Sequence, residues 1–214
     1  NILFIIVDQW RGDSLGVLGH PAAITPNLDA LAGEGVLFRL PYAPSAPCGP
    51  ARASLLTGLY VMNHRVVANG LPQDRRHATM PGALRRAGLD PSLIGYTTTI
   101  PDPRDAPPED PRFREIGDVL AGFNVFAHFD EVEFRNYLGW VAGRGHALPP
   151  EPTDIWLPAS GPPGPSAAPS RIPAALSDTA WSGEHALAFL RGTRRAHPWM
   201  LHLGFLRPHP PFIA

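Results

Sequence analysis

The residues of this chain that are best suited to chemistry surround its single cysteine, in the run Cys48-Gly49-Pro50-Ala51-Arg52. Proline is favoured in the first turn of a helix and helix-forming residues follow Pro50, so the spacing predicts that Cys48 stands at a helix start. The free N–H groups of a first turn and the helix dipole favour an anion there. Arg52, one turn after Cys48, has a planar fork of N–H donors suited to phosphate or sulfate oxygens. The run therefore indicates a nucleophile beside an anion site.

Other interpretations compete for Cys48. Cysteine is among the most buried residue types, so a small core residue beside an unrelated arginine explains the same run. A tyrosine-phosphatase-type thiolate loop places its arginine further along, at a position where this chain has Ser54. Zinc binding by thiolate needs further cysteines or closely spaced histidines, which this part of the sequence lacks. On the residues alone, the nucleophile and the core cysteine both stay open.

Three predicted strands position the other polar residues. The apolar runs Ile2–Val7, Ser92–Tyr96 and Trp199–Leu206 are typical of strands in a largely parallel sheet, and we expect Ile2–Val7 to be buried on both faces. Ligands of open α/β sheets bind at the carboxyl ends of the strands. The polar residues at these ends are therefore expected to share one rim, suited to an anion or a metal ion; they are Asp8, Tyr96, Thr98 and His209.

Helical patterns alternate with these strands, which predicts an α/β layered fold. Thr25 is expected to cap a helix with Pro26 in its first turn and with Leu28 and Leu31 on its apolar face, before the stretch Gly33–Gly35 stops it. Further helices are expected over Ala51–Tyr60, Met80–Ala87 and Ser177–Leu190, and a short strand over Val36–Phe38. Residues 101–112 and 148–173 are rich in Pro, Asp, Gly and Ser and are expected to be irregular excursions within one domain.

Composition narrows the range of partners. The 214 residues are 44% hydrophobic and can bury one sizeable core. The net charge of −1 argues against nucleic acid or an anionic membrane as a partner and favours a small ligand. No apolar stretch approaches the ~20 residues that span a bilayer, and one cysteine excludes an internal disulfide framework. The chain begins at Asn1 without Met, so a removed signal or missing first residues stay open, and the cytoplasm is the expected location.

The run from Ser45 to Gly58 resembles the sulfatase signature, Cys-x-Pro-x-Arg followed by small residues and Leu-Leu-Thr-Gly. Three more segments are similar to landmarks of that superfamily, in the same order: Asp8-Gln9, Thr25–Asp29 and Arg207–Phe212. The resemblance extends over nearly the whole chain. It implies an alkaline-phosphatase-like α/β sandwich with a central, mostly parallel sheet. It also implies that residues 1–214 are the amino-terminal part of a sulfatase-type catalytic domain, whose missing carboxy-terminal portion supplies further metal ligands.

Within the superfamily the chain most resembles the phosphonate monoester hydrolases, which also cleave phosphodiesters and some sulfate esters. The segments that carry this likeness are Asp8-Gln9, Cys48–Arg52, Leu59–Arg65 with Asn69, and Ile94–Thr99. Many true sulfatases have a lysine two residues before the position of His64, where this chain has Met62. Hydrolysis of sulfuric esters, as by an arylsulfatase, is the alternative, and a truncated, non-catalytic fragment is the second alternative.

The resemblance also implies roles for individual residues. Cys48 would be oxidised to formylglycine by a formylglycine-generating enzyme, and its hydrated aldehyde would attack a small anionic ester. Asp8 and the modified Cys48 would bind a divalent cation, Ca²⁺ or Mn²⁺. Arg52 would orient the nucleophile, and His209 would protonate the leaving oxygen or take a proton from the hemiacetal. The residues implied in substrate binding are Gln9, Asn69, Tyr96 and Thr98. Each could instead satisfy loop backbone. The full-length protein is expected to be a homo-oligomer.

Overall fold

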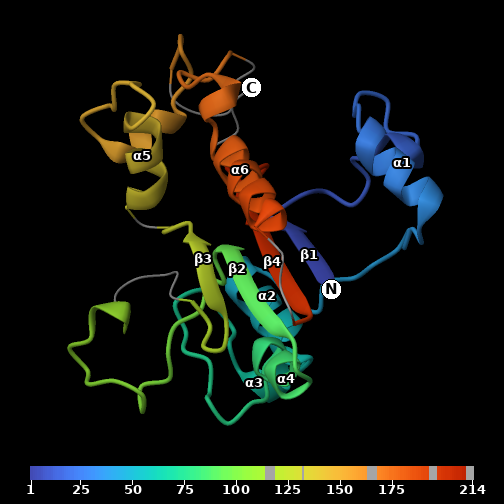
Figure 1. The fold of residues 1–214 in the computed structure, drawn as a ribbon, viewed down its shortest axis with the longest axis vertical. Helices are drawn as coiled ribbons and strands as arrows, with labels where there is room; N and C mark the ends of the chain where they lie inside the picture. The colour runs from blue at the N-terminus through green and yellow to red at the C-terminus, as the bar shows by residue number, and fades with distance from the viewer. Residues whose placement is uncertain (114–118, 132, 163–167, 193–196, 211–214) are drawn as a thin grey trace.

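A computed structural model of the chain describes residues 1–113, 119–131, 133–162, 168–192 and 197–210. Its centre is a four-stranded sheet of β1 (Ile2–Val7), β2 (Asp90–Gly95), β3 (Asn124–His128) and β4 (Trp199–Phe205), in the order β1-β4-β2-β3 (Figure 1). All three strand pairs are parallel. The prediction of an α/β fold with a parallel sheet is therefore confirmed.

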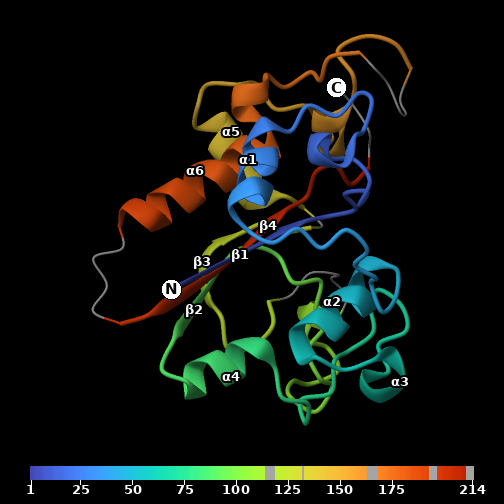
Figure 2. The ribbon, with the colours of Figure 1, turned by 90° about the vertical axis from the view of Figure 1, so that its right-hand side faces the viewer.

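Helices cover both faces of the sheet, as the edge-on view in Figure 2 shows. On one side lie α5 (Arg135–Ala142) and α6 (Asp178–Arg191), and on the other lie α2 (Cys48–Thr57), α3 (Val61–His64) and α4 (Met80–Arg86). Successive strand residues point to opposite faces. Accordingly, Ile94 packs in the apolar cluster that contains Trp181 of α6, whereas Leu93 packs in the cluster that contains Leu56 of α2.

Short 3₁₀ helices occupy parts of the connections: η1 (Gly16–Leu18), η2 (Pro111–Phe113), η3 (Pro152–Trp156) and η4 (Ala174–Leu176). Of the tryptophans, Trp156 is 7% exposed in the main core and Trp10 is 38% exposed. Among the described residues, no helix combines the length and the apolar composition that crossing a bilayer would need.

Local signals located some helices well, but they did not predict α3 or α5. Helix α1 (Pro26–Glu34) follows Thr25 and ends at Gly35. Helix α6 begins after Ser177, whose Oγ accepts a hydrogen bond from the Ala180 amide. The predicted helix at Ala51–Tyr60 was displaced, since α2 runs from Cys48 to Thr57. It ends early because Gly58 adopts φ 71° and donates its N–H to Ser54 O.

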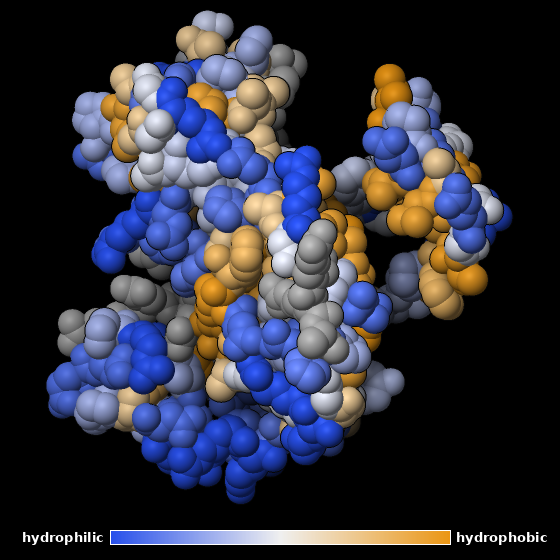
Figure 3. Space-filling model, viewed as in Figure 1, coloured by the Kyte–Doolittle hydropathy of each residue, from blue (hydrophilic) through white to orange (hydrophobic). Residues whose placement is uncertain are grey.

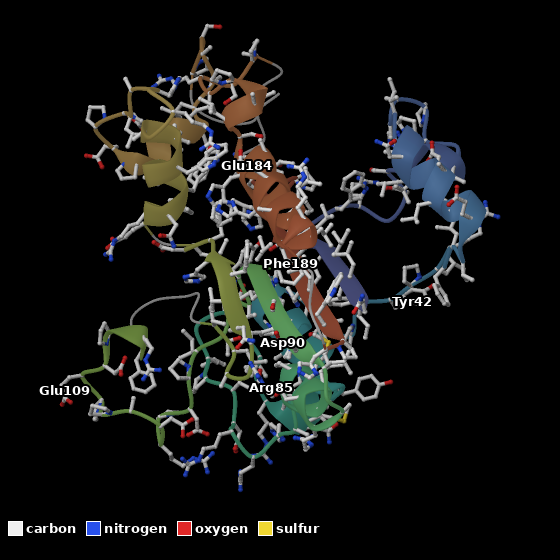
Figure 4. All side chains as sticks on the ribbon, viewed as in Figure 1. Tyr42, Arg85, Asp90, Glu109, Glu184 and Phe189 are labelled. Carbon is white, nitrogen blue, oxygen red and sulfur yellow. The ribbon has the colours of Figure 1, made fainter. Side chains whose placement is uncertain are left out.

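Strand β3, which was not predicted from the sequence, lies at one edge of the sheet. Hydrogen bonds from α4 and to β2 hold it there. Arg85 of α4 donates hydrogen bonds to Gly122 O at 2.5 Å and to Asn124 Oδ1 at 2.7 Å. Asn124 in turn donates to Asp90 Oδ1 at the start of β2. Figure 4 shows Arg85 and Asp90 near one another at this end of the sheet. These bonds tie α4, β2 and β3 together.

The expectation that β1 is buried on both faces was wrong. In the described chain β1 pairs with β4 alone and forms the other edge of the sheet, with Ile2, Leu3 and Ile5 between 42% and 49% exposed. Val36–Phe38 forms no strand, because it has no neighbouring strand to pair with; Val36 is 81% exposed.

The predicted apolar face of α1 is also exposed. Leu31 is 64% exposed, and Figure 1 shows α1 set apart from the sheet. Hydrophobic surface is visible on the α1 segment and along the neighbouring edge of the main body in Figure 3. In α6, Trp181 and Ala186 are buried as expected, but Leu187 is 51% exposed.

Candidate active site

The carboxyl ends of the parallel strands present polar side chains to one edge of the sheet. Asp8 follows β1, Tyr96 and Thr98 follow β2, Glu131 follows β3, and His209 follows β4. The Asp8 amide still donates to Phe205 O at 3.0 Å, so this carboxylate stands where the β1–β4 ladder ends. The arrangement is the one in which open α/β sheets bind ligands.

A buried ion pair joins Arg52 of α2 to Asp8. The Arg52 side chain is 5% exposed and the Asp8 side chain 13%, and Arg52 Nη2 lies 3.2 Å from Asp8 Oδ2. Arg52 also donates to Tyr96 O at 3.2 Å, and its guanidinium lies 4.3 Å from the centre of the Tyr96 ring. The Tyr96 hydroxyl donates to the same Asp8 oxygen at 2.7 Å. Burial, and next to it the negative charge of Asp8, raise the pKa of Tyr96 far above its usual range, although Arg52 opposes this. The hydroxyl therefore stays protonated as a donor to Asp8.

Cys48 is the first residue of α2 and is partly buried. Asn69 donates from Nδ2 to Cys48 Sγ at 3.1 Å and accepts at Oδ1 from the Gly49 amide at 2.7 Å. A Cβ on Gly49 would lie 2.8 Å from Asn69 Oδ1 and 3.2 Å from Asn69 Cα. Only glycine leaves room for this contact, which fixes the Cys48 side chain against the loop that carries Asn69.

His64, the last residue of α3, is hydrogen-bonded to α2. Its Nδ1 accepts from the Val66 amide at 3.1 Å, so in the neutral ring the proton sits on Nε2, which donates to Ser54 Oγ at 2.8 Å. Burial lowers the pKa of His64, which keeps the ring neutral. A buried, fully bonded imidazole between α2 and α3 is structural, as helix-end histidines commonly are.

Thr98 contacts a carboxylate that the sequence reading missed. Thr98 Oγ1 lies 3.3 Å from Glu131 Oε1 and 3.2 Å from Glu131 Oε2. Burial raises the pKa of Glu131 to about 7, opposed by the charge of Arg52 and by the bond from Thr98, while the charges of Asp8 and Asp130 add to the rise. The apolar run Val125–Phe129 before Asp130 was the signal that would have revealed both β3 and this residue.

His209 and Gln9 lie in turns at the strand ends. The His209 amide donates to Leu206 O at 3.0 Å, and its Nδ1 donates to Pro210 O at 2.9 Å. Gln9 is exposed and has a left-handed φ of 59°. Within the described ranges, no hydrogen bond joins His209 or Gln9 to Cys48 or Arg52. Pro211 and Phe212, which complete the predicted landmark turn, lie outside the described residues.

The described residues offer only part of a metal site. Both side-chain bonds to Asp8 end on Oδ2, so Oδ1 is the Asp8 oxygen that could bind a cation. In the part of the chain that the structure describes, no group of three or more His, Cys, Asp or Glu side chains is placed to hold a metal ion. Asp8 fits one ligand position, and these residues do not complete the set.

Known proteins share this sequence and this fold. The multifunctional alkaline phosphatase superfamily protein PehA of Trinickia caryophylli is 51% identical, over 100% of this chain and 43% of that protein. An arylsulfatase of Clostridium perfringens is 30% identical, over 99% of this chain and 44% of that protein. The crystal structure of the phosphonate monoester hydrolase of Agrobacterium radiobacter superposes with a TM-score of 0.91 at 44% identity, covering 99% of this chain and 41% of that one.

These similarities show how much of its relatives the chain covers and to which family it belongs. The chain spans about two fifths of the length of the relatives that it matches. Its sheet and helices correspond to the amino-terminal part of an alkaline-phosphatase-like structure. The model of the Sulfatase family matches residues 1–214, with the Cys48 loop at the start of α2, and on this match the chain belongs to the sulfatase family.

Proposed function

We propose that the protein containing this chain hydrolyses phosphonate monoesters and phosphodiesters by means of a formylglycine formed from Cys48. The observation that carries the proposal is the setting of Cys48: it opens α2, and Asn69 holds both its sulfur and the Gly49 amide. The similarity to a protein described as a phosphonate monoester hydrolase, 44% identical with a TM-score of 0.91, supports the substrate class.

In the proposed reaction, Cys48 in its hydrated formylglycine form loses the proton of one hydroxyl to solvent and attacks the phosphorus through that oxygen. A new O–P bond forms, the bond to the leaving alcohol or phenol breaks, and His209 gives the leaving oxygen its proton. The second hydroxyl then gives its proton to the deprotonated His209 and the aldehyde re-forms, which breaks the bond between Cβ of residue 48 and the attacking oxygen and releases that oxygen with the phosphonate or phosphate. Water rehydrates the aldehyde, so atoms and charge balance over the cycle.

The other residues would hold the cation or stabilise the negative charge of the ester. Arg52 holds Asp8 in place through the buried ion pair, and Asp8 would be one ligand of a divalent cation, Ca²⁺ or Mn²⁺. When bound, such a cation would acidify the nucleophile and screen the ester anion. Asn69 and Thr98 are proposed as hydrogen-bond donors to the non-bridging oxygens of the ester. Gln9 and Tyr96 are proposed as the other substrate-binding residues. The remaining metal ligands would come from outside the described residues.

Sulfate ester hydrolysis is the second candidate, favoured by the 30% identity to an arylsulfatase over 99% of this chain. The position that carries a lysine in many sulfatases is Met62, which is 81% exposed on α3 and offers no charge to a sulfate. This difference is why phosphonate and phosphate esters stand first.

The test uses the full-length protein encoded by the natural gene, co-expressed with a formylglycine-generating enzyme. We expect kcat/KM to be highest for an aryl phosphonate monoester or an aryl phosphodiester, and lower for the matching aryl sulfate. A preference for the sulfate by orders of magnitude would replace the first candidate by the second.

The nucleophile is tested separately by mass spectrometry and mutation. The Cys48 peptide of active protein should lose about 18 Da, as expected for conversion of the thiol to an aldehyde. Cys48→Ala should lower kcat by at least about a thousandfold, as removal of other catalytic nucleophiles does. Active protein with an unmodified thiol would refute the mechanism. The same preparations, run on a sizing column, test the proposed homo-oligomer.

A further inference from the structure

Two acceptors compete for the single hydroxyl proton of Thr98: the carboxylate of Glu131 and the bound ester. Its Oγ1 lies 3.2 Å from Glu131 Oε2, a distance at which the hydroxyl donates to the ionised carboxylate. The proposed function needs the same proton to point at a non-bridging oxygen of the ester. Thr98 and Gly49, the residue after Cys48, line one small cavity, so Thr98 lies close to the loop that carries Cys48. Both bonds cannot form at once while Glu131 is ionised.

Charge adds a second difficulty for an ionised Glu131. The charged and titratable groups that face it are Arg52 from α2, Asp8 at the end of β1, Tyr96 at the end of β2, and the adjacent Asp130. The guanidinium of Arg52 is already bonded to Asp8. An ionised Glu131 therefore adds a negative charge near the place where an anionic ester is expected to bind, and a neutral one does not.

We propose that Glu131 is a positioning residue that works in its neutral form: its carboxyl O–H donates to Thr98 Oγ1 and so turns the Thr98 proton toward the bound ester. The proposal rests on the proposed function, since it concerns the same site. One proton moves, between Glu131 and solvent, and the direction of one hydrogen bond reverses. Burial, which raises the pKa of Glu131 to about 7, makes the neutral form accessible near neutral pH.

The experiment follows kcat/KM for an aryl phosphonate monoester from pH 5 to pH 9 in the full-length protein. In wild type we expect kcat/KM to fall by about tenfold per pH unit above the pKa of Glu131. Glu131→Gln keeps the size of the side chain and its N–H can donate to Thr98, so this fall should disappear. The matched control is Glu133→Gln, which removes an exposed carboxylate paired with Arg135 and should leave the profile unchanged.

Thr98→Val separates the hydrogen bond from the charge. Loss of the Thr98 donor should lower kcat/KM by about 10- to 100-fold, the usual range for a bond to a charged group. In the Thr98→Val background, Glu131→Gln should give clearly less gain at pH 8.5 than it gives with Thr98 present. An equal gain in both backgrounds would show that only charge matters and would overturn the positioning role. So would an active wild type with no alkaline fall.

A binding measurement tests Glu131 even if the proposed function fails. Sulfate keeps its charge across this pH range, so calorimetry with sodium sulfate reports the site without turnover. Sulfate should bind wild type at least fivefold more weakly at pH 8.5 than at pH 6, and Glu131→Gln with little change. An affinity that falls equally in both proteins would overturn the inference. Absence of hydrolysis with the expected sulfate behaviour would refute the proposed function alone. Thermal unfolding of each variant checks that it is folded.

Discussion

Asn69 holds Cys48 by its sulfur and holds the first turn of α2 by its backbone, with a single side chain. Its Nδ2 lies 3.1 Å from Cys48 Sγ and its Oδ1 lies 2.7 Å from the Gly49 amide. An amide side chain that donates to one residue and accepts from the next allows little rotation of either. The orientation of the proposed nucleophile is therefore set by a loop 21 residues further along the chain.

Gly49→Ala tests this relationship. The new Cβ would lie 2.8 Å from Asn69 Oδ1 and 3.2 Å from Asn69 Cα, so the Asn69 loop must shift and its contacts with residues 48 and 49 are lost. Small displacements of reacting groups are costly, and we expect kcat/KM to fall by about 100-fold. The control is Gly183→Ala in α6, where a Cβ meets nothing within 4 Å. Gly183→Ala should leave kcat/KM unchanged, and a Gly49→Ala enzyme of normal activity would contradict the role of Asn69.

Tyr96→Phe tests the support of Asp8. The variant removes the 2.7 Å bond from the Tyr96 hydroxyl to Asp8 Oδ2 and leaves the buried carboxylate with Arg52 alone. Loss of a bond to a charged group should cost about 1.5–3 kcal/mol of unfolding free energy. It should also lower kcat/KM, because Asp8 is then less firmly placed.

Tyr137→Phe is the matched control for that variant. Tyr137 is 1% exposed, and its hydroxyl donates to Leu176 O at 2.9 Å, so the variant loses a bond between uncharged groups. Its cost should be about 1 kcal/mol by urea denaturation, with kcat/KM unaffected. If the two variants lose activity equally, the loss reflects general stability, and the Tyr96 hydroxyl has no specific role in positioning Asp8.

Elements with a strong local signal could be predicted from the sequence. Ser177 gives α6 its cap, and the largely apolar segments of β2 and β4 locate the centre of the sheet. The failures were elements whose state depends on distant neighbours. Val36–Phe38 has the composition of a strand but no partner, whereas the short apolar run in β3 becomes a strand because it pairs with β2.

The sequence predicted which residues lie at the candidate site better than it predicted the hydrogen bonds between them. The strand-end rule placed Asp8 and Tyr96 on one rim, and they are in direct contact across 88 residues of sequence. No rule of sequence tells which donor meets which acceptor. That Thr98 meets Glu131 depends on the directions in which loop side chains leave β2 and β3, and these follow from tertiary packing.

Glu131→Gln should also change how stability depends on pH. The pKa of Glu131 is raised to about 7, so between its ordinary value near 4.5 and 7 the folded protein holds a proton that the unfolded chain has lost. Stability of the wild type therefore falls as pH rises through this window. The variant lacks this loss and should gain up to about 3 kcal/mol over wild type above pH 7, at about 1.4 kcal/mol per pKa unit. Urea denaturation at pH 5 and pH 8 measures the difference, and Glu133→Gln, at an exposed site, should show none.

His202 predicts a change at the acid end of the pH range. It is fully buried in β4 between the rings of Phe4 and Phe123, with centroids 5.5 and 5.4 Å away, and neither ring nitrogen has a hydrogen-bond partner among the described residues. Burial, with a smaller effect of Arg52, lowers the pKa of His202 to about 3. Below pH 6.5 the unfolded chain therefore binds a proton that the folded protein refuses, and wild-type stability falls as pH falls.

His202→Leu removes both the unpartnered nitrogens and this proton linkage. The variant should be more stable by about 1–3 kcal/mol at pH 7, since a buried polar group without a partner carries a desolvation cost of that order. Its advantage should grow by about 2 kcal/mol on going to pH 5, at about 1.4 kcal/mol per pH unit below the ordinary histidine pKa. His146→Leu, at a partly exposed position, controls for the general loss of an imidazole. Denaturant unfolding at the two pH values decides the matter: parallel acid destabilisation of wild type and His202→Leu would mean that His202 is charged or bonded in the folded protein, and that the apolar setting between Phe4 and Phe123 does not control it.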